Sequence, residues 1–182
     1  MKRAVYKFIF FNLLGWKIVG DLPRDINKFI FVVAPHTGNW DFILGIFIRG
    51  IMQFNSNFLA IESLFIGRLG WIMRRMGGEA VDRSRNRNIV DQVVDIFNRE
   101  QEFKLAITPE GTRKKVKEWR TGFYHIARLA KIPLILSAMD WGRKEVRFSA
   151  PFYPGDDMEE DMRKIKHYFS DATGRFHSQY GH

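Results

Sequence analysis

A histidine and an aspartate stand five residues apart in the segment Pro35–Asp41 (PHTGNWD), and their chemistry fits general base catalysis. A carboxylate that accepts a hydrogen bond from one ring nitrogen of His36 orients the imidazole and leaves the other nitrogen to remove a proton from an alcohol. On a continuous helix the two side chains would point about 140° apart, so the chain between them must fold back. The alternative is a helix cap at Asp41 and a loop histidine with satisfied hydrogen bonds.

A second polar block, Ile107–Arg113 (ITPEGTR), places a carboxylate and a guanidinium three positions apart. Glu110 and Arg113 either hold each other in a structural ion pair or share a polar ligand such as a glycerol phosphate. A third cluster, Asp82–Arg87 (DRSRNR), is rich in arginine. It is either a phosphate clamp or a solvated charged loop.

The elements that position these blocks follow from hydrophobic patterning. The continuous apolar run Lys28–Ala34 predicts a strand buried on both faces. The same reasoning predicts strands at 57–61, 79–81, 103–107, 133–139 and 145–150, and helices at 42–54, 63–76, 88–99, 122–130 and 158–170.

This alternation predicts an α/β fold, a single-domain sandwich with a largely parallel or mixed central sheet covered by helices. The length of 182 residues suits one domain, and no Pro/Gly-rich linker interrupts the pattern. In such sheets functional residues gather beyond the carboxyl ends of strands. His36 and Glu110 both follow predicted strands in this way.

Composition narrows the classes of function. The formal net charge of +9 predicts an anionic partner, and the absence of cysteine excludes disulfides, thiolate zinc sites and a cysteine nucleophile. No second His or Cys stands at ligand spacing from His36, so we expect no metal. No recognition element for nucleic acid is evident, so nucleic acid is not an expected partner.

The N-terminal segment Ala4–Gly20 is apolar but interrupted by lysines, and no signal cleavage site follows it. It is shorter than the roughly 20 apolar residues of a membrane span. We therefore predict a membrane-surface helix over residues 1–20, followed by the single domain over 21–182. Apolar side chains would sit at the headgroup boundary: Phe8, Phe11, Leu14 and Trp16. The alternative is a helix packed on the domain.

The ordered blocks HTGNWD, GGEAVDR, TPEGTR and KIPLIL, between Phe31 and Met139, resemble those of the glycerophospholipid acyltransferases typified by 1-acylglycerol-3-phosphate acyltransferase. The resemblance implies that His36, oriented by Asp41, is the general base for direct acyl transfer. It also implies a set of residues that bind the polar acceptor: Arg83, Glu110, Gly111, Thr112 and Arg113.

The resemblance further implies acyl-CoA or acyl carrier protein as the donor, a lysophospholipid-type acceptor and no cofactor. With the basic charge, it predicts a peripheral enzyme on an anionic membrane surface at the cytoplasmic face. Two other classes stay open. One is a non-catalytic basic protein that binds anionic lipid, and the other is a hydrolase that uses the same His36 and Asp41 on water.

Overall fold

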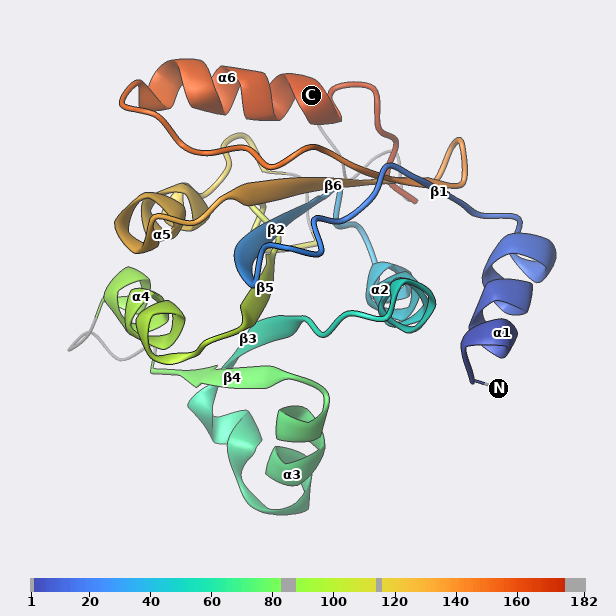
Figure 1. Cartoon of the computed structure of the whole chain (residues 1–182), viewed down its shortest axis with the longest axis horizontal. Helices are drawn as coiled ribbons and strands as arrows, with labels where there is room; N and C mark the ends of the chain where they lie inside the picture. The colour runs from blue at the N-terminus through green and yellow to red at the C-terminus, as the bar shows by residue number, and fades with distance from the viewer. Residues whose placement is uncertain (1, 83–87, 114–115, 176–182) are drawn as a thin grey trace.

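The computed structural model describes residues 2–82, 88–113 and 116–175, which fold around a seven-stranded sheet of order β1-β7-β6-β2-β5-β3-β4 (Figure 1). Neighbouring strands run parallel except for the antiparallel pair β6 and β7. The strands are β1 (Lys17–Val19), β2 (Lys28–Ala34), β3 (Asn57–Ile61), β4 (Gly78–Val81), β5 (Phe103–Ile107), β6 (Leu134–Asp140) and β7 (Glu145–Phe148).

Helices cover both faces of this sheet (Figure 1). They are α1 (Lys2–Lys7), α2 (Asn39–Met52), α3 (Gly67–Arg75), α4 (Ile89–Arg99), α5 (Gly122–Ala130) and α6 (Met158–Phe169), with a π-helical turn η1 (Phe8–Leu13) after α1 and a 3₁₀ turn η2 (Glu62–Phe65) before α3.

Two hydrophobic clusters form because the central strands are apolar on both sides. One packs β2 and β6 residues such as Ile30 and Leu136 against α4, α5 and α6. The other packs Phe29 and Phe31 against α2 and against the N-terminal helix, which is α1 together with η1. The crossovers β2–α2–β3 and β3–α3–β4 step across the sheet in the same direction, so right-handed connections place α2 and α3 on one face. The α/β fold with a mixed sheet is as predicted.

The N-terminal segment differs from the predicted helix over 1–20. Helical structure ends at Leu13, Gly15 adopts a positive φ of 69°, and Lys17–Val19 pairs parallel with β7. Trp16 is 3% exposed and packs edge to face on Trp141, so the prediction that it lies at a headgroup boundary is wrong. The strand pairing of β1 carries this indole into the core. Phe8 and Phe11 are exposed.

The helix predicted over 63–76 is also interrupted. Ile66 is extended and Gly67 has a φ of +60°, which separates η2 from α3. A left-handed residue cannot continue a right-handed helix, and glycine adopts that conformation without steric cost. Across the described ranges, no helix is both long enough and apolar enough to cross a bilayer.

Candidate active site

The loop between β2 and α2 brings His36 and Asp41 into contact. His36 Nδ1 lies 3.2 Å from Asp41 Oδ2, so the contact predicted from the sequence is present. The chain folds back because the same oxygen accepts the backbone N–H groups of Thr37 and Gly38, at 2.8 and 2.9 Å. Asp41 is the third residue of α2, where a carboxylate satisfies amides that the first helical turn leaves without partners. Since Nδ1 faces Asp41, Nε2 is the ring nitrogen left for another partner.

Asp41 is buried yet holds its negative charge. Burial raises the pKa of its carboxyl, but hydrogen bonds from His36, from the Gly38 amide and from Trp141 outweigh that effect and lower the pKa below its ordinary value of 3.8. A carboxylate that is ionised at neutral pH can stabilise a protonated imidazole beside it.

Trp141 is a site residue that the sequence analysis missed. Its indole Nε1–H donates to Asp41 Oδ1 at 2.8 Å, so both carboxylate oxygens are held. Trp141 directly follows β6, which pairs parallel with β2. The rule that functional residues lie beyond the carboxyl ends of strands applies to β6 as it does to β2, and it would have singled out this tryptophan.

The segment Thr173–Arg175 lies over the same loop. The Arg175 backbone N–H donates to Thr37 Oγ1 at 3.0 Å, and its guanidinium stands 5.0 Å from the Trp40 ring centroid and 4.9 Å from that of Trp141. Gly174 packs so closely on Thr37 that an added Cβ would clash with it. The segment Thr173–Arg175 therefore packs on the His36–Asp41 loop and stabilises its conformation.

Glu110 lies beside His36 because β5 and β2 are adjacent parallel strands. Its Oε1 accepts the His36 backbone N–H at 3.1 Å, and the side chain is 6% exposed. Its Oε2 is buried without a hydrogen-bond partner among the described residues. Burial is the main cause of a raised pKa at this carboxyl. A buried carboxylate with one oxygen left over is suited to a donor group on a ligand.

The other residues predicted to bind the acceptor substrate are Gly111, Thr112, Arg113 and Arg83. Gly111 has a φ of +62° and packs against the Arg120 guanidinium, where a Cβ would clash. Thr112 is half-buried and Arg113 is exposed. Arg83 lies outside the described residues. The strand before it, β4, is three strands from β2, which corresponds to roughly 14 Å.

Replacing Glu110 with Gln should make the unfolding free energy less dependent on pH. The folded-state pKa of Glu110 is raised above 4.5, so the folded protein binds more protons than the unfolded chain between those two values. Wild-type stability therefore falls relative to Glu110→Gln as pH rises through this window, by at most about 1.4 kcal/mol per pH unit. Urea unfolding between acidic and mildly alkaline pH measures the gap.

Glu118→Gln is the matched control, since it removes the same charge from an exposed position. Wild-type stability that stays constant or rises relative to Glu110→Gln as the pH rises would contradict the burial of an uncompensated carboxylate at Glu110.

The arrangement combines an imidazole, His36, which is oriented by Asp41, with a second buried carboxyl group, Glu110, beside it. In the part of the chain that the structure describes, no group of three or more His, Asp or Glu side chains could hold a metal ion.

Comparison with known proteins identifies the family. The acyltransferase family model matches residues 19–139. The 1-acyl-sn-glycerol-3-phosphate acyltransferase of Saccharomyces cerevisiae is 30% identical over 132 residues, which cover 67% of this chain and 42% of that protein. The chain thus spans about two fifths of that relative's length.

The fold is also found in a solved structure. The crystal structure of the 1-acyl-sn-glycerophosphate acyltransferase from Thermotoga maritima superposes with a TM-score of 0.63 at 20% identity, covering 91% of this chain and 74% of that one. At that identity the likeness concerns the fold alone. The family match extends over most of the chain and includes both polar blocks, and the chain therefore belongs to the glycerophospholipid acyltransferase family.

Proposed function

We propose that this protein transfers a fatty acyl group from an acyl thioester to a hydroxyl of a glycerolipid precursor such as 1-acylglycerol-3-phosphate. The donor is acyl-CoA or acyl carrier protein, and no cofactor takes part. The observation that carries the proposal is the 3.2 Å contact between His36 Nδ1 and Asp41 Oδ2 at the carboxyl end of β2. It leaves Nε2 as a base for an alcohol.

In the proposed reaction His36 Nε2 takes the proton of the acceptor hydroxyl as that oxygen attacks the thioester carbonyl carbon. The carbon–sulfur bond then breaks, the ester forms, and the imidazolium returns the proton to the leaving thiolate. Asp41, ionised and held by four donors, stabilises the imidazolium in between. General base catalysis contributes about 10²- to 10⁴-fold, so positioning supplies the remaining acceleration.

The acceptor would bind along the carboxyl edge of the sheet. Glu110 Oε2, which lacks a partner among the residues placed, is proposed to accept a hydrogen bond from an acceptor hydroxyl. Gly111, Thr112 and Arg113 follow it in the same turn, and Arg83 follows β4 in the sequence. The two arginines are proposed to bind the acceptor phosphate through bidentate contacts.

An assay with a labelled acyl thioester and a panel of acceptors, with and without phosphate, tests this proposal. We expect label in an ester product, and more of it with phosphate-bearing acceptors. Release of free fatty acid without an acylated acceptor would mean that the same pair acts on water. A folded protein that leaves the thioester intact would be a non-catalytic member of the family.

We further propose that the face formed by the N-terminal helix, α2 and α3 rests on the membrane. Almost all exposed large apolar side chains of the described residues lie on these elements or on the segment from Ile61 to Ile66. The exceptions are Val19, Leu129 and Tyr153. Val5, Phe8 and Leu13 follow one another at about one turn on the N-terminal helix, with lysines beside them. This composition favours an anionic bilayer at the cytoplasmic face.

Phe8→Asp should reduce sedimentation with anionic vesicles about tenfold, because it puts a charge where an apolar ring would be buried in the headgroup region. Tyr153→Asp is the matched control, since both side chains are 62% exposed and Tyr153 lies off this face. Equal binding by the two variants would reject the proposed face.

A further inference from the structure

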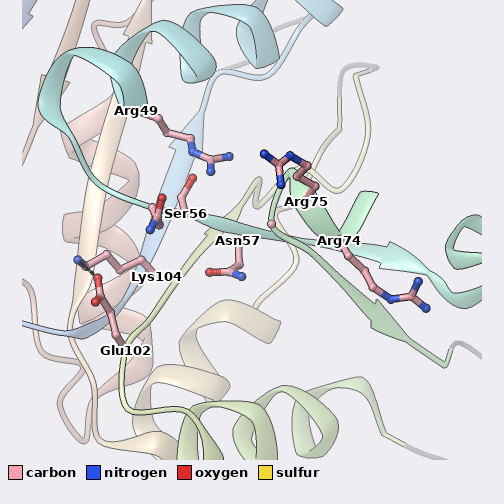
Figure 2. Close-up of a pocket in the computed structure, with 9 residues that line it drawn as sticks. Arg49, Ser56, Asn57, Arg74, Arg75, Glu102 and Lys104 are labelled. Atoms are coloured by element: carbon pink, nitrogen blue, oxygen red, sulfur yellow. Dashed lines mark hydrogen bonds and ion pairs between the residues drawn. The ribbon is translucent and has the colours of Figure 1, made fainter. Parts of the chain in front are cut away.

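A polar pocket lies at the amino ends of β3, β4 and β5, opposite to the edge that carries His36. Its volume is about 370 Å³. The last turns of α2 and α3 converge there and contribute Arg49, Arg74 and Arg75, while the loop before β3 contributes asparagine and serine side chains (Figure 2). The acyl transfer proposed above assigns no role to it.

Two guanidinium groups face each other in this pocket. Figure 2 shows Arg49 and Arg75 pointing toward one another, whereas Arg74 extends away. Arg49 is half-buried, and burial lowers the pKa of its guanidinium, although one nitrogen donates to the Met76 carbonyl at 2.9 Å. Arg75 is exposed, and its guanidinium also lies 5.7 Å from the Trp71 ring centroid. Two like charges that face each other repel, and an anion between them relieves that repulsion.

The carboxylate that lines the pocket does not neutralise this pair. Glu102 accepts from Lys104 Nζ at 2.7 Å. In Figure 2 that pair lies apart from Arg49 and Arg75. The carboxyl ends of α2 and α3 supply roughly half a negative charge each, which offsets about one of the remaining cations. The balance over Arg49, Arg74 and Arg75 therefore remains positive.

We infer that this pocket binds a phosphate group, with Arg49 and Arg75 as its cationic clamp and the side chains of Asn55 and Ser56 as neutral donors. Arginine pairs bind phosphate oxygens through parallel N–H donors. The phosphate belongs either to a membrane lipid headgroup or to a free anion. Leu69, Trp71 and Ile72 are exposed on the same helix as Arg75, and this apolar neighbourhood favours the lipid headgroup.

The proposed acceptor site would also bind phosphate, so the test needs a signal that comes from the pocket itself. NMR of the whole chain titrated with inorganic phosphate gives such a signal. We expect the Gly77 amide, which lines the pocket, to shift with saturation. Arg75→Gln should weaken the affinity read at Gly77 about tenfold, which corresponds to losing one charged partner. Arg68→Gln, which removes an exposed charge from α3 outside the pocket, should change it less than about twofold.

Asn55→Asp, which adds a negative charge to the pocket wall, is a second variant that should weaken the same affinity. Absence of a phosphate-dependent shift at Gly77, or equal losses in Arg75→Gln and Arg68→Gln, would overturn the inference. Neither readout depends on catalysis, so the result is independent of the proposed acyl transfer.

Sedimentation with phosphatidylcholine vesicles, alone or mixed equally with phosphatidylglycerol, identifies the source of the phosphate. If the lipid headgroup is the ligand, Arg75→Gln binds the mixed vesicles more weakly than Arg68→Gln does, and inorganic phosphate competes. If the two variants bind the mixed vesicles equally while the Gly77 shift depends on Arg75, the pocket takes the free anion.

Discussion

Replacing His36 with Gln should lower kcat by about 10²- to 10⁴-fold while the protein stays folded. The glutamine amide can still donate to Asp41 Oδ2, which His36 Nδ1 contacts at 3.2 Å, so the loop keeps its main hydrogen bond. What is lost is the nitrogen that takes the proton of the acceptor hydroxyl. Transfer of label from an acyl thioester to the acceptor, measured at saturating acceptor, gives kcat, and circular dichroism confirms the fold.

His125→Gln is the matched control, since His125 is exposed on α5 and lies outside the site. It should retain wild-type kcat. Transfer by His36→Gln within a few-fold of wild type would show that another group removes the proton, and the proposed mechanism would then fail.

Asp41→Asn should cost about 3 kcal/mol of stability as well as activity. Four donors converge on this carboxylate: His36 Nδ1, the Thr37 and Gly38 amides, and Trp141 Nε1. An asparagine has one acceptor oxygen, so in either orientation its NH₂ group faces a donor in a buried place. A buried polar group left without its partner costs about 1 to 3 kcal/mol, and more where charge is involved. Urea unfolding at neutral pH measures the loss.

The stability gap between wild type and Asp41→Asn should close in acid. The folded-state pKa of Asp41 lies below its ordinary value of 3.8, so the contribution of the carboxylate is fully present above that pH. It is lost as the pH falls below 3.8 and through the folded pKa, because the unfolded chain binds a proton there more readily than the folded protein does. A gap that persists at the lowest pH where the protein stays folded would contradict the role given to the charge.

Asp161→Asn is a control that separates the structural role of Asp41 from its proposed catalytic role. Asp161, in the first turn of α6, is also buried, and it accepts hydrogen bonds from the Tyr124 hydroxyl and the Gly155 amide. Its asparagine variant should lose stability yet keep the kcat of the folded protein. Asp41→Asn should lose both, because it removes the group that orients His36 and stabilises the imidazolium.

The sequence predicts most accurately the elements whose apolar pattern has clear ends. The bounds of β2, β3, β5 and α5 agree with the predictions because polar or turn-forming residues flank each run. The strand β1 was missed because three residues are too few for an alternating pattern to mark a strand. Its pairing with β7 depends on a contact between residues more than a hundred positions apart.

The site was predictable as far as local motifs extend. His36, Asp41 and Glu110 stand in short blocks that follow strands, and parallel pairing of β2 with β5 brings the blocks together. Trp141 and Arg175 belong to no such block. The position of Trp141 after a strand marks it as a candidate, but its contact with Asp41 and those of Arg175 with Thr37 and Trp40 join segments 100 residues or more apart. A local pattern does not specify such contacts.

The hydrogen bond from Trp141 to Asp41 gives the protein a built-in spectroscopic probe. The chain has five tryptophans, and the indole of Trp141 donates directly to the carboxylate that orients His36. The indole N–H resonance of Trp141 should therefore move when that carboxylate changes its charge or its partner. One peak in a nitrogen–proton spectrum thus follows the state of the candidate catalytic pair through a titration or a turnover, without any label foreign to the chain.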